Sequence, residues 1–349
     1  MYLFTLAGMA VTAYALPLVI SQVGTGVLTE VLGPSRTLVL GLLVFSISCL
    51  VGTAVTSYTF FLVARAFQGL GSGLALPVSM GMAASQPPPG RTSTAIGGIQ
   101  AAFAIGLALG PGTGGLFAEH LHWRALYAVL GVAAIVAAAT VALSYSGQSH
   151  RAGSGSPLAP LKQALTIPAV RMISLAGFLS LLALMGILIF VGVWLQRSGL
   201  AGPAMSGLLL SIPGIVGVVV APLAGLLGDR WGNRRIVIGG IVLFLAGSLG
   251  LIVTPGTLAA YPPLLLLIGI GLACMITNVG AIALSLRPEL RQAISGVFNG
   301  SRFFAAVMAP VALTPVYEEF SIRGVLLVIV ATSVLLAFVV RPAERGSDR

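Results

Sequence analysis

Eleven apolar stretches, each long enough to cross a lipid bilayer as a helix, dominate this sequence of 349 residues. A spanning helix needs about 20 apolar residues, at a rise of ~1.5 Å each. The stretches cover approximately 4–31, 37–57, 60–85, 93–117, 124–146, 169–195, 204–228, 235–254, 260–285, 293–316 and 322–340. Because lipid offers no hydrogen bonds, the backbone of such segments must be bonded within the chain. The sequence therefore predicts an all-α integral membrane protein with about 11 transmembrane helices.

The composition supports this prediction and argues against a nucleic-acid-binding protein. Only 7% of the residues are charged, against about 25% in an ordinary soluble domain. The formal net charge is +10, but nucleic-acid-binding proteins gather their basic residues on one face. Here those residues sit mostly in short gaps between apolar stretches. We expect the partner of this surface to be the lipid bilayer, with no nucleic acid bound.

The distribution of basic residues predicts the orientation. Gaps on one side of the membrane, together with the C-terminal tail, carry 13 Lys and Arg residues, whereas those on the other side carry only Arg124, Arg197 and Arg323. By the positive-inside rule the first side is cytoplasmic. We therefore expect a multi-pass protein of the cell (plasma or inner) membrane with a cytoplasmic C-terminus.

A segment rich in Gly, Ser and Pro separates the first five stretches from the last six, and it carries Arg151 and Lys162. This composition is typical of a linker. We predict an N-terminal bundle at 1–147, a cytoplasmic linker at 148–168, a C-terminal bundle at 169–341 and a cytoplasmic tail at 342–349.

The two halves repeat one another in the same direction. Gly26, Glu30, Gly33 and Arg36 recur 199 residues later as Gly225, Asp229, Gly232 and Arg235. The pair Gly97 and Gly296 keeps this offset, whereas Gly71 and Gly271 are 200 residues apart, a slip of one residue. Parallel repeats related by an axis along the membrane normal are one known plan of transporters, with the substrate site between the halves.

The offset also predicts an anomaly at the start of the chain. Met1 corresponds to Leu200, so the stretch at 169–195 has no counterpart in the first half. We therefore expect that a first helix is missing from this chain, through a misplaced start or genuine loss. The N-terminal bundle would then hold the equivalents of helices 2–6 and the C-terminal bundle those of helices 7–12.

With these segments placed, the sequence resembles the major facilitator superfamily, in particular its bacterial drug:proton antiporters of the twelve-helix type lacking helix 1. The repeated Gly-x-Leu-x-Asp-x-x-Gly-x-x-Arg pattern resembles the loop signature of that family, although the first copy has Glu30 in place of Asp. The resemblance implies gating loops at Gly26, Glu30, Gly33, Arg36, Gly225, Asp229, Arg230, Gly232 and Arg235. An acid there can pair with a basic side chain or face a helix N-terminus, and the alternative is that these are turn residues only.

Arg65, Gln68 and Gly69 resemble a second family signature, in which the Arg is implicated in proton coupling. A charge within a membrane helix is unfavourable by about 2.5–3.5 kcal/mol or more, so it usually faces a polar cavity. Because Arg65 lies near the outer end of its stretch, a side chain that extends to the interface is the alternative.

The antiporter signature of the family is matched at every fixed position, namely Gly97, Gly106, Gly110, Pro111, Gly114 and Gly115. The resemblance implies export. Glycines allow a neighbouring helix to approach closely, and Pro111 removes a backbone hydrogen bond and bends its helix. Small-residue packing without a gating role is the alternative.

Few polar residues lie at membrane depth, and five of them are candidates for the lining of a central cavity: Tyr14, Gln100, Asn278, Asn299 and Arg302. Arg302 is one turn beyond Asn299, so the two share a helix face. All eight acidic residues fall in loops or at helix ends. A coupling carboxylate therefore lies on the missing helix, or the substrate is neutral or anionic and meets Arg65 or Arg302.

The resemblance implies transmembrane transport, with multidrug efflux of small organic molecules in exchange for protons by a monomeric antiporter. We expect no enzyme activity, no cofactor and no metal, because His120 and His122 have no further ligands in view. The alternatives are a truncated remnant or sensor that does not transport, and a carrier of a neutral or anionic metabolite.

Overall fold

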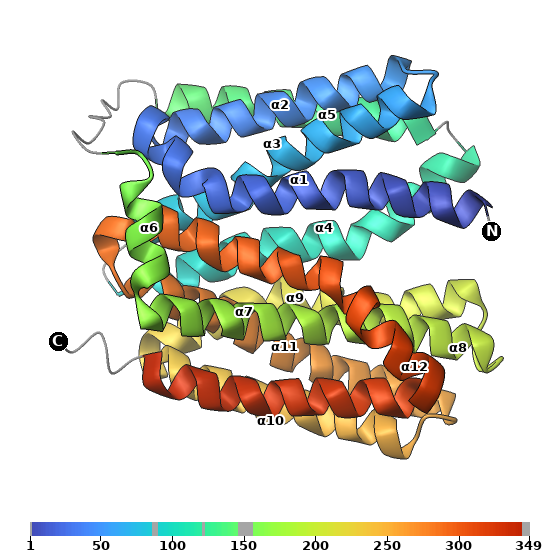
Figure 1. Cartoon of the computed structure of the whole chain (residues 1–349). Helices are drawn as coiled ribbons and strands as arrows, with labels where there is room; N and C mark the ends of the chain where they lie inside the picture. Colours follow the sequence, from blue (N-terminus) through green and yellow to red (C-terminus); the bar gives the residue numbers. More distant parts are fainter. Residues whose placement is uncertain (1, 86–89, 121–122, 146–155, 344–349) are drawn as a thin grey trace. The chain divides into compact units, whose positions relative to one another are not determined.

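The computed structural model describes residues 2–85, 90–120, 123–145 and 156–343, and the regular elements in these ranges are helices (Figure 1). The first elements are α1 (Tyr2–Leu32), α2 (Pro34–Ala54), α3 (Tyr58–Ser85), α4 (Thr92–His120), α5 (Trp123–Ser144) and α6 (Ala159–Thr166). They are followed by α7 (Pro168–Gly186), α8 (Gly192–Arg197), α9 (Pro203–Trp231), α10 (Asn233–Val253), α11 (Tyr261–Ser285) and α12 (Arg291–Ala343). The π-helical turn η1 (Ile187–Val191) joins α7 to α8, and the 3-10 turns η2 (Leu258–Ala260) and η3 (Pro288–Leu290) precede α11 and α12.

Ten segments of the described chain are helical, long and apolar enough to cross a membrane. The last of them, Pro288–Val340, has 53 residues, which is about 80 Å of helix against a hydrocarbon core of about 30 Å. The backbone leaves the helical region at Ser321, with φ 57° and ψ −163°, and the chain doubles back there (Figure 1). Two membrane helices therefore lie within α12, so the described part of the chain contains the eleven that the sequence predicts.

Two helix boundaries differ from the prediction in ways that local chemistry explains. Helix α2 begins at Pro34 and not at residue 37, because proline at the first helical position has no N–H to leave unbonded. The predicted linker contains a further helix, α6, which begins near Pro160 and contacts α1. Its Ala, Leu, Lys and Gln residues are good helix formers.

The chain divides into two compact units by its internal contacts. Unit 1 comprises Met1–Met82, Gly112–Ile167 and Glu289–Phe303. Unit 2 comprises Ala83–Pro111, Pro168–Pro288 and Phe304–Arg349. Each unit thus includes one segment from the opposite half of the sequence: unit 1 holds the beginning of α12, and unit 2 holds the first part of α4.

The sequence repeat is visible in the turns of both units. Gly33 ends α1 at φ 84°, and Gly232 ends α9 at φ 91°. Each donates its N–H to the carbonyl oxygen four residues earlier, at 3.0 Å for Gly33 and 2.9 Å for Gly232. Positive φ at both positions explains why glycine occupies them.

Helix packing repeats as well. A Cβ atom added to Gly71 on α3 would lie 2.6 Å from the Gly41 carbonyl oxygen on α2. A Cβ atom added to Gly271 on α11 would lie 2.5 Å from the Gly240 oxygen on α10. Gly41 and Gly240 are 199 residues apart, whereas Gly71 and Gly271 are 200 residues apart. The same contact between two helices is therefore kept in both halves despite this difference of one residue.

Candidate functional site

In unit 2, the Asp229 carboxylate at the end of α9 binds the first turn of α4. The amide N–H of Ser93 donates to Oδ1 at 2.9 Å, and the amide and hydroxyl of Thr94 donate to Oδ2 at 2.8 and 2.6 Å. The first amides of a helix have no partner within it and carry partial positive charge. A half-buried carboxylate at this point therefore satisfies these donors and opposes the charge.

Neighbouring polar groups fix the end of α9 further. The Ser93 hydroxyl donates to Asn233 Oδ1 at 2.7 Å, which ties the start of α4 to the start of α10. Asn278 on α11 donates to the Ala224 carbonyl oxygen of α9 at 3.2 Å, and its Oδ1 lies beside Gly228, where a Cβ atom would clash. The predicted gating residue Asp229 and the cavity candidate Asn278 therefore both hold α9 in place.

The close contact of α4 with α9 in unit 2 recurs between the beginning of α12 and α1 in unit 1. A Cβ atom on Gly97 would lie 2.5 Å from the Ala221 oxygen, and one on Gly296 would lie 2.5 Å from the Gln22 oxygen. Gly296 lies 199 residues after Gly97, and Gln22 lies 199 residues before Ala221. Each helix from the first half of the sequence in one pair therefore corresponds to a helix from the second half in the other pair. The repeat therefore generates two equivalent helix pairs, one in each unit.

The chemistry of these two helix pairs differs. Glu30 occupies the position that corresponds to Asp229, and Gln292 and Ala293 replace Ser93 and Thr94. The beginning of α12 thus has no hydroxyl where Thr94 binds the acid in unit 2. Sequence reasoning missed Ser93 and Thr94, although a Ser/Thr pair just before an apolar run is a typical helix start.

Among the antiporter-signature residues, Gly97 makes a close approach, whereas a Cβ atom added at Gly106 or Gly110 meets no atom of the described residues within 4 Å. At 100° per residue, positions 106 and 110 face away from position 97, by about 180° and 140°. Ala104 and Ala108 share the face of Gly97 instead, and they contact added Cβ positions at Gly217 and Gly214 at 3.2 and 3.3 Å. The backbone of α4 is helical through Pro111, Gly114 and Gly115, whose surroundings lie outside the described side chains.

A second cluster surrounds Arg65 in unit 1. Its Nε donates to the Ala10 carbonyl oxygen at 3.3 Å, and its Nη1 donates to Gln68 Oε1 at 3.0 Å. The guanidinium carbon is 4.5 Å from the centre of the Tyr14 ring. Arg65 is therefore directed at α1 and Gln68, and it does not extend along its own helix to the interface.

Residues around this cluster complete it. The Ser72 hydroxyl donates to the Tyr14 hydroxyl at 2.9 Å, and Gln68 Nε2 contacts the Cys49 sulfur at 3.4 Å. Gly69 lies directly against the Tyr14 backbone, where a side chain would clash. Of the sequence-predicted residues, the structure thus brings together Tyr14, Arg65, Gln68 and Gly69.

Asn299 and Arg302 on α12 lie together in unit 1, as their spacing predicts. Arg302 Nη1 donates to Asn299 Oδ1 at 3.4 Å, and the Asn299 amide donates to the Ser295 carbonyl oxygen at 2.9 Å. Both side chains are buried, with an exposure of 1% for Arg302 and 0% for Asn299. Gln100 is also buried but belongs to unit 2, and its amide atoms have no hydrogen-bond partner among the described residues.

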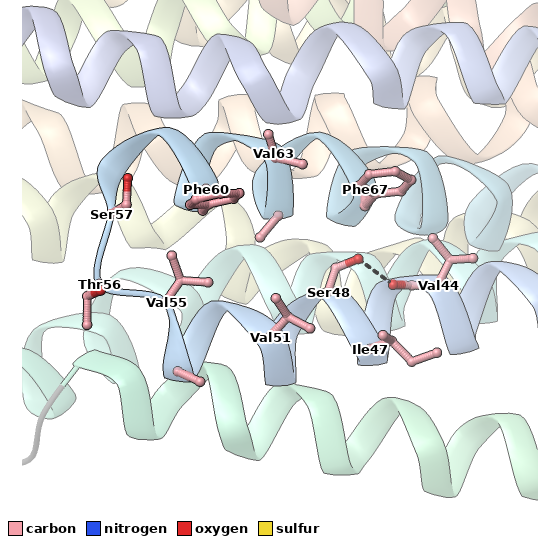
Figure 2. Close-up of a pocket in the computed structure, with 12 residues that line it drawn as sticks. Val44, Ile47, Ser48, Val51, Val55, Thr56, Ser57, Phe60, Val63 and Phe67 are labelled. Atoms are coloured by element: carbon pink, nitrogen blue, oxygen red, sulfur yellow. Dashed lines mark hydrogen bonds between the residues drawn. The ribbon is translucent and has the colours of Figure 1, made fainter.

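An apolar groove of about 630 Å³ opens between α2 and α3 in unit 1 (Figure 2). It is lined by Val44, Ile47, Ser48, Val51, Ala54, Val55, Thr56, Ser57, Phe60, Val63, Ala64 and Phe67. The Ser48 hydroxyl is bound to the Val44 carbonyl oxygen at 2.6 Å, and Phe60 is 67% exposed. Lipid tails can cover such a surface, so the groove by itself indicates no specific ligand.

Three relatives place these features in a family context. The uncharacterized MFS-type transporter YwfA of Bacillus subtilis (strain 168) is 22% identical over 306 residues, covering 85% of this chain and 73% of that protein. The tetracenomycin C resistance and export protein of Streptomyces glaucescens is 24% identical, covering 81% and 63%. The quinolone resistance protein NorA of Staphylococcus aureus (strain MRSA252) is 29% identical over 131 residues, covering 37% and 34%. The chain spans 61–73% of the length of the first four curated relatives that it matches.

Solved structures share the fold. The Escherichia coli fucose:proton symporter FucP matches with a TM-score of 0.78 at 13% identity, covering 97% of this chain and 91% of that chain. The human organic anion transporter MFSD10 matches with a TM-score of 0.75 at 16% identity, covering 95% and 83%. The profile of the Major Facilitator Superfamily matches residues 3–310. The chain therefore belongs to the major facilitator superfamily, whose members are membrane transporters and not enzymes.

Proposed function

We propose that this chain is a secondary active transporter that exports small organic molecules in exchange for protons by alternating access. It would act in the cell (inner) membrane as a monomer, with the C-terminus in the cytoplasm. One relative is named for tetracenomycin C resistance and export, and another is named for quinolone resistance. The antiporter signature on α4 supports the same direction of transport.

The observation that carries this proposal is the bonding of Asp229 to the first turn of α4, with bonds of 2.6–2.9 Å. We propose that 1–147 and 169–341 act as two bundles, so that this contact joins one bundle to the other. Its small residues allow close packing, and its three hydrogen bonds stabilise one state. An alternating mechanism needs contacts of this kind, which hold in one state and break in the other.

Proton coupling is proposed for the Arg65 cluster. Arg65 binds Gln68 and the Ala10 carbonyl oxygen within the membrane, and ionisable groups at such depth usually serve ion or proton pathways. Tyr14, beside the guanidinium, connects the cluster to Ser72 through its hydroxyl. A change in this network would alter how α1 and α3 pack against each other.

Accumulation of dyes in everted vesicles tests the proposal. Vesicles that contain the full chain should take up ethidium, rhodamine 123 or rhodamine 110 when a proton gradient is imposed, and uptake should collapse when a protonophore is added. Arg65→Gln should lose the gradient dependence, whereas Arg287→Gln, which changes an exposed residue outside the proposed site, should keep it. Gradient-independent uptake would favour a carrier without coupling, and absence of uptake would favour the remnant or sensor.

A further inference from the structure

The Arg302 guanidinium is buried, and two of its nitrogens make no hydrogen bond with the described residues. Its exposure is 1%, and neither Nε nor Nη2 has a hydrogen-bond partner among the described residues. The Nη1 contact with Asn299 at 3.4 Å is longer than an ordinary hydrogen bond. The Phe298 and Phe303 rings are 5.7 and 5.9 Å away, near the outer limit of a cation–π interaction.

The two unbonded nitrogens form one edge of the guanidinium. The Nε–H and one N–H of Nη2 point in parallel, which is the fork that binds both oxygens of a carboxylate. Asn299 helps to orient this fork, because its own amide is fixed to the Ser295 backbone at 2.9 Å and its Oδ1 faces Arg302. Ser295 is in turn bound to the Pro77 carbonyl oxygen of α3 at 2.7 Å. A chain of hydrogen bonds therefore orients the charged edge, and its two N–H groups have no hydrogen-bond partner among the described residues.

The position of Arg302 makes its lack of a partner costly. It lies 11 residues after Arg291, about 16 Å along the helix and hence near mid-membrane. The acidic residues in the described part of the chain lie at helix ends, in η3 or beside the break at Ser321, namely Glu30, Glu119, Asp229, Glu289, Glu318 and Glu319. An unpaired buried charge is destabilising by several kcal/mol, and such a group in a transporter commonly marks the substrate path. Arg65, in contrast, already has three partners.

We propose that Arg302, oriented by Asn299, binds the carboxylate of the transported molecule, so that the substrates are organic carboxylates. This inference rests on the proposed transport function and adds the substrate class. Arg302 is covered in the state described, so the carboxylate reaches it when the beginning of α12 moves away from α1 and α3. The substrate carboxylate then pairs with the Arg302 guanidinium, so that the buried charge is no longer unpaired.

Two fluorescent dyes that differ only at the carboxylate test whether this group is recognised. Rhodamine 110 has a free carboxylate, and rhodamine 123 is its methyl ester. We expect the purified full chain to bind rhodamine 110 at least about tenfold more tightly, as measured by fluorescence anisotropy, since a charged hydrogen bond is lost with the ester. Arg302→Gln should remove this preference. Arg302→Lys should keep only part of the preference, because lysine keeps the charge but lacks the two parallel N–H groups. Arg287→Gln should keep all of the preference.

Thermal unfolding gives an independent readout. Arg302→Met removes an unpaired buried charge with little change of volume, so the melting temperature should rise by about 2–4 °C or more. A merely structural Arg302 predicts a fall instead. The inference is overturned if the wild-type chain shows no preference between the dyes, if the preference survives Arg302→Gln, or if Arg302→Met lowers the melting temperature.

The transport function fails separately from this inference. If ethidium and both rhodamines all lack gradient-driven uptake in vesicles, the proposed transport is wrong and the substrate class falls with it. If both dyes are taken up at equal rates and bound equally, transport stands and the carboxylate site is wrong.

Discussion

Replacement of Asp229 by Asn changes one charge and almost no volume at the contact between α9 and α4. The carboxylate accepts three hydrogen bonds, two from the amides of Ser93 and Thr94 and one from the Thr94 hydroxyl. A hydrogen bond to a charged group is worth about 1.5–3 kcal/mol, and a neutral one about 0.5–1.5 kcal/mol. Asn also offers one acceptor oxygen where Asp offers two.

The expected loss follows from these contributions. In Asp229→Asn the remaining hydrogen bonds are weaker, one acceptor is lost, and the attraction to the helix N-terminus (about 0.3–1 kcal/mol) is lost. Together these changes should destabilise the contact between α9 and α4 by about 2–4 kcal/mol. The contact should therefore open about 30-fold to several hundred-fold more often, at 1.4 kcal/mol per factor of ten.

Hydrogen exchange of the Ser93 and Thr94 amides measures this opening directly, because both amides bind Asp229 in the closed contact. In lipid nanodiscs, a peptide that covers the start of α4 should exchange faster in Asp229→Asn by the factor given above. Glu289→Gln, an exposed acid in η3, is the matched control and should leave this peptide unchanged. Unchanged exchange in Asp229→Asn, or equal acceleration in the control, would refute the reasoning.

Five further substitutions test the turns, the helix packing and the Arg65 cluster. Gly33→Ala and Gly232→Ala should each lower the free energy of unfolding by about 1–3 kcal/mol in thermal unfolding, and by similar amounts, since both glycines have positive φ with extended ψ at matching turns; unequal effects would argue against the repeat. Gly71→Ala should destabilise by about 1–3 kcal/mol because its Cβ would meet the neighbouring helix backbone, whereas Gly106→Ala should leave the melting temperature unchanged or raise it. Arg65→Lys should fold normally and yet slow gradient-driven uptake, because an ammonium cannot bind Gln68 and the Ala10 oxygen in the same geometry; normal uptake would remove Arg65 from the coupling proposal.

The helices and the repeat were predictable from sequence because each depends on local or periodic signals. Apolar runs of spanning length define the helices, and the break in α12 falls at Ser321, between the predicted ranges 293–316 and 322–340. The offset of 199 residues anticipates the matching turns at Gly33 and Gly232. The one-residue slip is also found in the packing of Gly71 and Gly271.

Contacts between distant segments could not be predicted in the same way. A repeat says that two helix pairs correspond, but not that α4 packs on α9, or that the beginning of α12 packs on α1. The sequence motif also does not say which helix face meets the neighbour, so the close approach of a helix at Gly106 and Gly110 stays a prediction. The sequence left Arg65 and Arg302 as equal candidates for an anion, and only the hydrogen-bond partners of each distinguish them.

The most direct test of alternating access is a reversible lock between α4 and α9. Ala104 Cβ is 3.2 Å from a Cβ added at Gly217, close to the 3.5–4.5 Å that a disulfide requires. Ala104→Cys with Gly217→Cys, made after Cys49 and Cys274 are replaced by Ser, should cross-link on oxidation. We predict that gradient-driven dye uptake stops in the oxidised protein and returns on reduction. Uptake in the oxidised protein that continues at the rate of the reduced protein, with the cross-link verified as complete, would contradict the account.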